Sequence, residues 1–140
     1  MIPDLQASLL CDDVRQERNG KFILIGLFDV IGSQTFPMVF QRMCIVNRWC
    51  CGEGEFVEKT RLVNPEKNSV LAEGKEIKVR LPNSEVTATN VEFFFNLTFP
   101  TAAVYWIEIL LDGDMRLRYP LRVNQIAMPP QQAGLDKPPA

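Results

Sequence analysis

Apolar and polar residues alternate along most of the chain, which is the pattern of β-strands that bury one face. No window of about a dozen residues has the periodicity of an amphipathic helix. The alternation predicts strands over residues 5–11, 22–30, 40–49, 56–63, 77–81, 91–99, 105–111 and 115–123.

Turn signals separate these segments. Asn19-Gly20 is typical of a type I′ hairpin turn because both residues tolerate positive φ, so the second strand is expected to fold back on the first. A second hairpin is predicted at "LDGDM", residues 111–115. Pro120 has no backbone donor, and the last strand should therefore follow a sheet edge for part of its length.

Short strands joined by turns predict an all-β fold, an antiparallel two-sheet immunoglobulin-like sandwich of seven to eight strands. A small barrel is the alternative. An immunoglobulin-type disulfide between the sheets is excluded, because no cysteine follows residue 51. At 140 residues the chain fits one domain, placed at residues 1–126. The Pro-rich segment 127–140 cannot supply a core and is expected to be a disordered tail.

The run from Phe22 to Phe28 has almost no polar break, so one wet face is not expected for this strand. Such a run is typical of a strand buried on both faces in the middle of a sheet. Its cover can be a loop of the same chain, a second copy or another protein.

A further apolar face is expected on the strands at 91–99 and 105–111. If Val91, Phe93 and Phe95 face the core, Phe94 faces outward. By the same alternation Trp106 and Leu110 face outward on the next strand. If the two strands pair, Phe94, Trp106 and Leu110 share one outer face, either as a protein interface or under a loop.

The charge and the N-terminus limit the partners. A net charge of −2 lacks the basic balance of a nucleic-acid-binding or anionic-membrane-binding protein. "MIPDLQAS" does not resemble a signal peptide, and the apolar runs are too short to cross a bilayer. We therefore expect a cytoplasmic protein without nucleic-acid or membrane partners.

The chain contains no histidine, which excludes Ser-His-Asp and Cys-His catalysis and most metalloenzyme sites. Neither an enzymatic activity nor a cofactor is expected. Cys11, Cys44, Cys50 and Cys51 fit buried, reduced thiols better than zinc ligands, since their spacing is wrong for zinc. The adjacent Cys50 and Cys51 leave a redox or regulatory thiol open, although no base would activate either as a nucleophile.

Two groups of charged residues are candidate ligand sites. Arg116, Arg118 and Arg122 on the last strand can bind a phosphate or carboxylate, or can simply form the wet face of an edge strand. Acidic residues gather at turns, where calcium binding competes with ordinary turn chemistry. They are Asp12, Asp13, Glu53, Glu55, Asp112 and Asp114.

Two stretches carry a resemblance to a known family. "LQASLLCDDVRQERNGKFILIGLFDVI" and "AAVYWIEILLDGDMRLRYPLRV" resemble a family of small bacterial proteins of unknown function. The resemblance implies an immunoglobulin-like sandwich and transfers no active site.

These observations favour a non-enzymatic interaction or structural module that forms a homo-oligomer or binds another protein. The residues expected at the contact are Phe94, Trp106 and Leu110. The alternative is a binding module for a carbohydrate or small anion, using loop carboxylates or the arginine row, with Trp49 or Trp106 as a sugar platform.

Overall fold

The structure of the chain is a computed structural model and describes residues 1–127. These residues contain ten strands: β1 (Asp4–Gln16), β2 (Phe22–Phe28), β3 (Val30–Ser33), β4 (Met38–Cys50), β5 (Gly54–Val63), β6 (Val70–Glu73), β7 (Ile77–Leu81), β8 (Ala88–Phe99), β9 (Ala103–Leu111) and β10 (Asp114–Gln125). Each of the eight expected strands has a counterpart among them.

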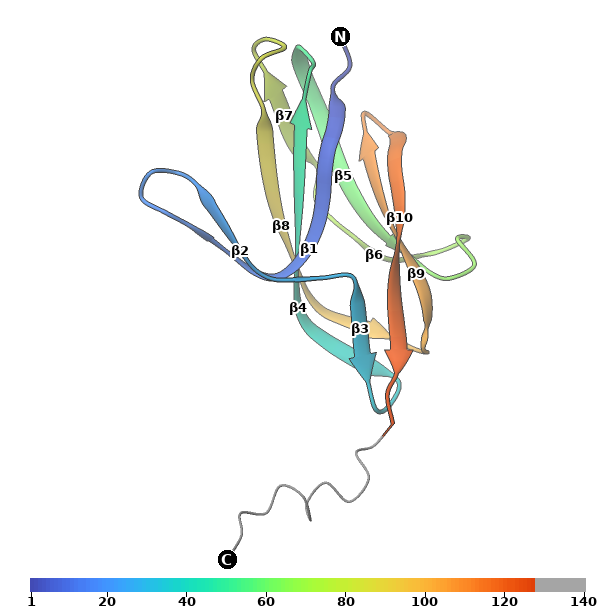
Figure 1. Cartoon of the computed structure of the whole chain (residues 1–140). Coiled ribbons are helices and arrows are strands. Elements are labelled where there is room, and N and C mark those ends of the chain that lie inside the picture. The colour runs from blue at the N-terminus through green and yellow to red at the C-terminus, as the bar shows by residue number, and fades with distance from the viewer. Residues whose placement is uncertain (128–140) are drawn as a thin grey trace, which may run out of the picture.

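The strands form two sheets, shown in Figure 1. One has four strands in the order β2-β1-β4-β8. The other has six in the order β3-β10-β9-β5-β6, with β7 also paired to β5. All pairs are antiparallel except β3 with β10, which run parallel. The expected all-β fold with two sheets is thus confirmed, and the expected count of seven to eight strands is wrong.

The two strands that sequence reasoning missed are β3 and β6, each of four residues. Four residues give too short an alternation to stand out from turns, and β3 begins at Val30, the last residue of the predicted strand 22–30, and continues into a connection that contains Gly, Ser and Pro. β3 belongs to the six-stranded sheet although β2 belongs to the other, so the chain changes sheet at Asp29.

One core fills the space between the sheets. Trp49 from β4 and Tyr105 from β9 are its largest fully buried side chains. Along β9 the alternation predicted from the sequence holds, because every second residue contacts the other sheet. The β9 residues in this core are Tyr105, Ile107, Ile109 and Leu111.

β8 and β9 do not pair with each other, so the condition for a shared outer face of Phe94, Trp106 and Leu110 is not met. β8 is an edge of the four-stranded sheet, and β9 lies inside the six-stranded sheet. At the crossing, the Tyr105 hydroxyl donates a hydrogen bond of 2.7 Å to the Thr101 carbonyl. This bond ties the start of β9 to the connection, so the chain passes from one sheet to the other there.

Both predicted hairpins exist, and they differ in turn type. Asp112 and Gly113 both have positive φ, 49° and 85°, which is the signature of a type I′ turn. In the first hairpin only Gly20 does, at 90°, and its N–H donates to the Glu17 carbonyl at 2.9 Å. That turn is a three-residue loop with a left-handed glycine, and the expected type I′ turn is wrong.

β10 pairs with β9 along its length and with β3 only from Arg122 to Gln125. The segment around Pro120 is therefore a free edge, as the sequence predicted. No helix in residues 1–127 is long and apolar enough to cross a membrane. The expected Pro-rich tail lies outside the described residues, apart from Ala127.

Candidate interaction surface

The β1–β2 hairpin projects from the sandwich (Figure 1). β1 pairs with β4 only as far as Cys11, and beyond that point it pairs with β2 alone. We call residues 12–27 the arm. Because the arm lacks a neighbouring strand on its outer side, its conformation depends on how its base packs against the four-stranded sheet.

A small second core holds the base of the arm. Cys11, Cys44 and Val46 are buried on the side of the sheet away from the main core. The arm side chains Val14 and Leu24 pack against them. Burial raises the pKa of the Cys44 thiol to about 11 and also raises that of Cys11, so both are neutral thiols at pH 7. Both act here as small hydrophobic side chains.

The rest of β2 is apolar and exposed. Ile23 and Ile25 are each 42% exposed and Leu27 is 62% exposed. β2 is the edge of its sheet, and within residues 1–127 no strand pairs with its outer side. The expectation of a central strand buried on both faces is therefore wrong. A continuous apolar run signals that a segment avoids water, and here no loop of the described chain covers it.

The exposed apolar surface continues from the arm across the four-stranded sheet. The strand register aligns one residue from each strand in a row, in the order Leu27, Cys11, Cys44 and Phe93. Residues in such a row point to the same face of a sheet. We use the name apolar surface for the exposed residues on and beside this row: Leu9, Leu27, Val39, Phe93 and Phe95.

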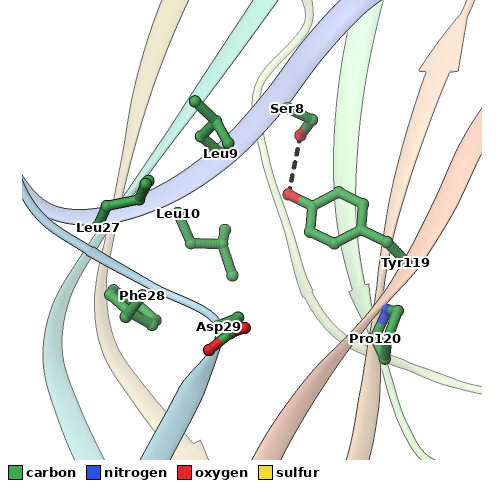
Figure 2. A pocket seen from close by; sticks show the side chains of 8 residues that line it. All are labelled: Ser8, Leu9, Leu10, Leu27, Phe28, Asp29, Tyr119 and Pro120. Carbon is green, nitrogen blue, oxygen red and sulfur yellow. Dashed lines mark hydrogen bonds between the residues drawn. The ribbon is translucent and has the colours of Figure 1, made fainter.

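Two hollows border the apolar surface. A groove of about 820 Å³ lies between the arm tip, at Lys21 and Phe22, and the sheet residues Val46 and Thr89. A cleft of about 380 Å³ lies where Leu27 and Phe28 approach Tyr119 of the other sheet (Figure 2). In that cleft the Ser8 and Tyr119 hydroxyls lie 2.8 Å apart, and burial raises the pKa of Tyr119 to about 12. The cleft is otherwise lined mainly by aliphatic and aromatic carbon, which suits an apolar side chain.

Phe94 does not lie where the sequence placed it. It is buried in the main core, and its neighbours Phe93 and Phe95 are exposed. The reason is Asn96, whose φ of 53° is left-handed and reverses the alternation between Phe95 and Leu97. The aromatic side chains that β8 presents outward are therefore Phe93 and Phe95, whose rings stack with centroids 6.2 Å apart.

Trp106 and Leu110 lie on the outer side of the six-stranded sheet, far from the arm in the strand order. Lys67 lies over the Trp106 ring, with its Nζ 4.2 Å from the ring centroid. Leu110 is only 8% exposed. A loop of the same chain covers the indole, and the expected shared face of Phe94, Trp106 and Leu110 does not form.

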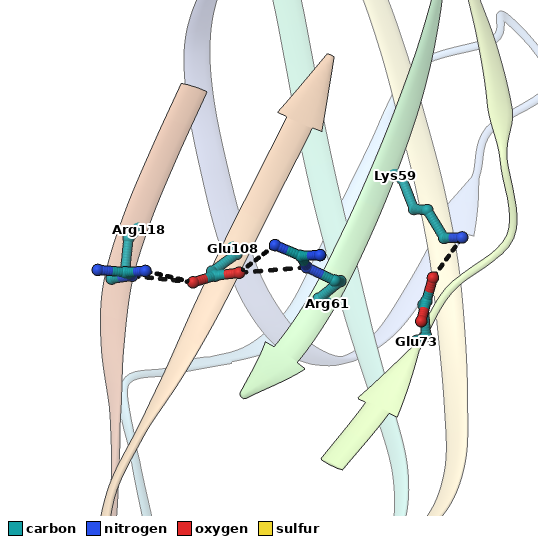
Figure 3. A network of polar contacts seen from close by, with 5 residues as sticks. All are labelled: Lys59, Arg61, Glu73, Glu108 and Arg118. Carbon is teal, nitrogen blue, oxygen red and sulfur yellow. Dashed lines mark hydrogen bonds and ion pairs between the residues drawn. The ribbon is translucent and has the colours of Figure 1, made fainter. Parts of the chain in front are cut away.

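Of the three arginines of the last strand, Arg118 is engaged within the chain (Figure 3). Arg118 donates to Glu108 at 2.7 Å, and Arg61 donates to the other oxygen of the same carboxylate at 2.8 Å. Burial acts to raise the pKa of Glu108, but the bonds from Arg118 and Arg61 outweigh it and hold that pKa below its usual range. Arg116 falls in a register shift, and Arg122 lies beside β3, so the three do not form one regular row.

Three of the six acidic turn residues, Asp13, Glu55 and Asp112, form local contacts. The Asp112 carboxylate accepts the Val57 N–H at 2.8 Å, and Asp13 pairs with Arg15 at 3.1 Å. Glu55 pairs with Arg80 at 3.3 Å. Among residues 1–127 no group of three acidic or cysteine side chains is arranged to hold a metal ion.

The structure also bears on Trp49 as a sugar platform and on the Cys50–Cys51 pair as a reactive thiol. Trp49 is completely buried, so it offers no platform for a sugar. The sulfurs of Cys50 and Cys51 lie 3.4 Å apart, and the hydrogen bond between them raises the pKa of Cys50. A raised pKa keeps the thiol protonated and makes it a poor nucleophile.

A buried polar cluster joins the two sheets. The sequence analysis did not predict it. Glu58 on β5 is 1% exposed and accepts hydrogen bonds from Trp49 Nε1 at 2.6 Å and Asn90 Nδ2 at 3.2 Å through one oxygen. Its other oxygen accepts from Asn47 Nδ2 at 3.2 Å. Nearby, Glu92 accepts the Lys75 N–H at 2.6 Å through one oxygen, and its other oxygen has no protein partner. The alternation along β5 contained this signal, because Glu58 and Thr60 share a face with core positions.

We expect Glu92→Gln to stabilise the protein at pH 7. Burial raises the pKa of Glu92, the Lys75 N–H lowers it, and the nearby Glu58 charge raises it. A raised pKa means that the folded state holds the proton more tightly, so stability is lost as pH rises above the unfolded value of about 4.3. Urea unfolding of both proteins between about pH 4 and pH 7 measures this. The variant should lose less stability than the wild type over that window, and equal pH profiles would contradict the assignment.

The fold and the surface together define the class of protein: an all-β two-sheet sandwich with a projecting hairpin arm whose second strand is apolar. Residues 6–124 match the model of a family of unknown function (DUF6941), and the chain belongs to that family. No curated protein matches the chain.

Proposed function

We propose that the protein is a non-enzymatic interaction module that binds another protein chain through the apolar surface. The observation that carries this proposal is the exposure of Leu27 and Phe95, 62% and 63%, on the same face of the four-stranded sheet. Contiguous exposed apolar residues, with aromatic side chains among them, are typical of protein interfaces.

The alternative of a carbohydrate- or anion-binding module has less support. Of its two candidate sugar platforms, Trp49 is buried and the Trp106 ring is covered by Lys67, and the Arg118 guanidinium is bound to Glu108. All four cysteines are unpaired, which agrees with a reducing compartment such as the cytoplasm.

We also infer that the sandwich is immunoglobulin-like. Its support is the topology, in which β3 changes sheet to run parallel to the last strand, β10. The bond from the Tyr105 hydroxyl to the Thr101 carbonyl is a further feature of such sandwiches, in which a tyrosine ties a strand start to the backbone a few residues upstream.

Leu27→Lys tests the proposed contact surface. The side chain is mostly exposed, so the change should alter the free energy of unfolding by less than about 0.5 kcal/mol. Association through the apolar surface should be lost, because a charge would have to be buried. The measurements are the molar mass by light scattering and the set of proteins retained from a cell extract, each compared with the wild type.

The matched control is Met115→Lys, which places the same charge at an exposed apolar site on β10, away from the arm. The proposal is supported if Leu27→Lys abolishes an association that Met115→Lys retains. It is overturned if the wild type has the mass of one chain, 15.9 kDa, and retains the same proteins as Leu27→Lys.

A further inference from the structure

We propose that the groove beneath the arm tip binds an acidic, apolar peptide segment of the partner protein. This groove, of about 820 Å³, lies between the tip of the arm and the outer face of the four-stranded sheet. The inference rests on the proposed function, because it assigns the chemistry of one part of the partner that the apolar surface contacts. It adds a site at which charge as well as apolarity selects the ligand.

The floor and one wall of the groove are apolar. Leu9 and Val46 are paired on the outer face of the sheet and form the floor, and Phe22 and Leu24 of the arm form the wall. Leu24 also packs in the second core, so the groove is closed at the base of the arm and opens toward its tip. Leu9 and Phe22 are 39% and 38% exposed. A ligand in the groove would therefore bury apolar surface that now faces water.

The charged residues that line the groove are both cations. They are Lys21 at the arm tip and Arg48 on β4, and neither an aspartate nor a glutamate of residues 1–127 lines the groove. Asp4 and Glu17 lie near these cations in the strand pairing, but neither forms an ion pair with them. The groove is thus a positive region on a chain with a net charge of −2, and it is complementary to an acidic ligand.

The loop that carries Lys21 is held by its own hydrogen bonds. The Glu17 N–H donates to the Lys21 carbonyl at 2.8 Å, and the Lys21 N–H donates to the Asn19 side-chain oxygen at 3.0 Å. Gln16 Nε2 donates to the Gly20 carbonyl at 3.1 Å. The second core holds the other end of the arm. The groove therefore exists before a ligand binds, which lowers the entropy cost of binding.

The neutral polar groups of the lining fit a peptide backbone. Gln6, Thr87 and Thr89 line the groove with amide and hydroxyl groups that donate and accept hydrogen bonds. A peptide presents matching groups at almost every residue, whereas a small apolar anion has only its head group. Leu9 belongs both to the groove and to the apolar surface, so a partner on that surface can extend one segment into the groove.

The test selects peptides from a phage-displayed random library on the full-length protein. We expect enrichment of Asp or Glu beside large apolar residues. The most enriched peptide is synthesised with a fluorescent label, and fluorescence polarisation measures its dissociation constant. Replacing its carboxylates with amides should weaken binding about threefold or more, and replacing its apolar residues with serine about tenfold or more.

A double charge reversal in the protein, Lys21→Glu with Arg48→Glu, tests the site. Repulsion then replaces attraction at both positions, so the dissociation constant should rise about tenfold at low salt, and less when salt is added. The matched control is Lys78→Glu with Arg116→Glu. It makes the same charge change at two exposed residues of the six-stranded sheet that form no ion pair within residues 1–127. Circular dichroism verifies that both variants are folded.

The inference is supported if acidic, apolar peptides are enriched and the groove variant weakens their binding while the control does not. It is overturned if no peptide is enriched, if the enriched peptides lack carboxylates, or if both variants bind them equally well. Octanoate, an apolar anion without a peptide backbone, is titrated against the labelled peptide. Displacement by octanoate at a similar dissociation constant would assign the groove to a small apolar anion and overturn the peptide.

The comparison with Leu27→Lys decides the proposed function separately. Loss of association in Leu27→Lys, together with a library that yields no acidic peptide, would keep the apolar surface and overturn the groove as its second site. Peptides that bind in the groove of a protein whose association Leu27→Lys does not change would keep the groove and overturn the apolar surface.

Discussion

Glu58→Ala is expected to destabilise the protein by about 3–5 kcal/mol, the largest effect of any single polar substitution in this chain. Glu58 is 1% exposed and accepts hydrogen bonds from both sheets. Its removal leaves the indole N–H of Trp49 and the amides of Asn47 and Asn90 without their acceptor in the interior. Each buried donor left unpaired costs about 1–3 kcal/mol.

Two further variants separate the hydrogen bonds from the packing. Glu58→Gln keeps the shape and one acceptor oxygen, and should cost only about 1–2 kcal/mol. Asn47 can assist by turning its amide, because its Oδ1 has no protein partner in the wild type. Glu58→Leu keeps most of the volume but no acceptor, so it should resemble alanine. Urea unfolding followed by circular dichroism measures all three, and a leucine variant as stable as the wild type would show that the cluster contributes nothing.

The energetic coupling between Trp49 and Glu58 can be measured with Trp49→Phe. This change removes the indole donor of the shortest hydrogen bond to Glu58, 2.6 Å. In that background Glu58→Ala leaves fewer unpaired donors, so its cost should fall by about 1 kcal/mol or more. Equal costs in both backgrounds would mean that the indole bond to Glu58 does not stabilise the fold.

Periodicity predicted the sandwich well where a strand has one buried face and no irregular residue. Along β9 the predicted inward residues Tyr105 and Ile107 are the buried ones. On β8 the same reasoning predicted the wrong faces because of a single residue. The left-handed backbone of Asn96 reverses the two faces, and nothing in the alternation of apolar residues marks an asparagine as left-handed.

The apolar run of β2 shows a different limit of prediction from the sequence. Its sequence predicts a covered segment, and the cover can be a loop of the chain, a second copy or another protein. What the run cannot indicate is its place in the sheet, because a central strand and an exposed edge that binds a partner have the same composition. The strand order therefore places Phe94 in the core and leaves the proposed contact surface on the four-stranded sheet, away from Trp106 and Leu110.

The buried cluster around Glu58 was missed for a related reason. Its members come from β4, β5 and β8, which are distant in sequence and meet only through the packing of the two sheets. An isolated glutamate in a strand resembles a solvated residue, and only its in-phase position with core residues distinguishes it.

Gly26→Val is expected to remove the arm from its observed position and cost about 1–3 kcal/mol. The φ of Gly26 is 70°, a conformation that a β-branched residue avoids. A Cβ at this position would also overlap the Asp12 carboxylate. Backbone strain and steric overlap therefore act together at the point where the arm leaves the sandwich.

The loss should be local, because the main core does not include the arm. Val14 and Leu24 would lose their packing against Cys11 and Cys44, whereas the residues around Trp49 would keep theirs. Hydrogen exchange followed by mass spectrometry should show faster exchange in residues 12–28 and unchanged exchange in β9. Unchanged exchange in the arm would contradict a role of Gly26 in its position.

Two rescue variants identify which of the two causes dominates. Combining Gly26→Ala with Asp12→Ala removes the steric overlap but keeps the backbone strain. Combining Gly26→Asn with Asp12→Ala reduces both, since asparagine tolerates the left-handed conformation better than other residues with a side chain. If the second pair restores slow exchange and peptide binding while the first does not, the left-handed glycine orients β2 for its partner. Peptide binding that persists in Gly26→Val, despite a displaced arm, would separate the binding site from β2.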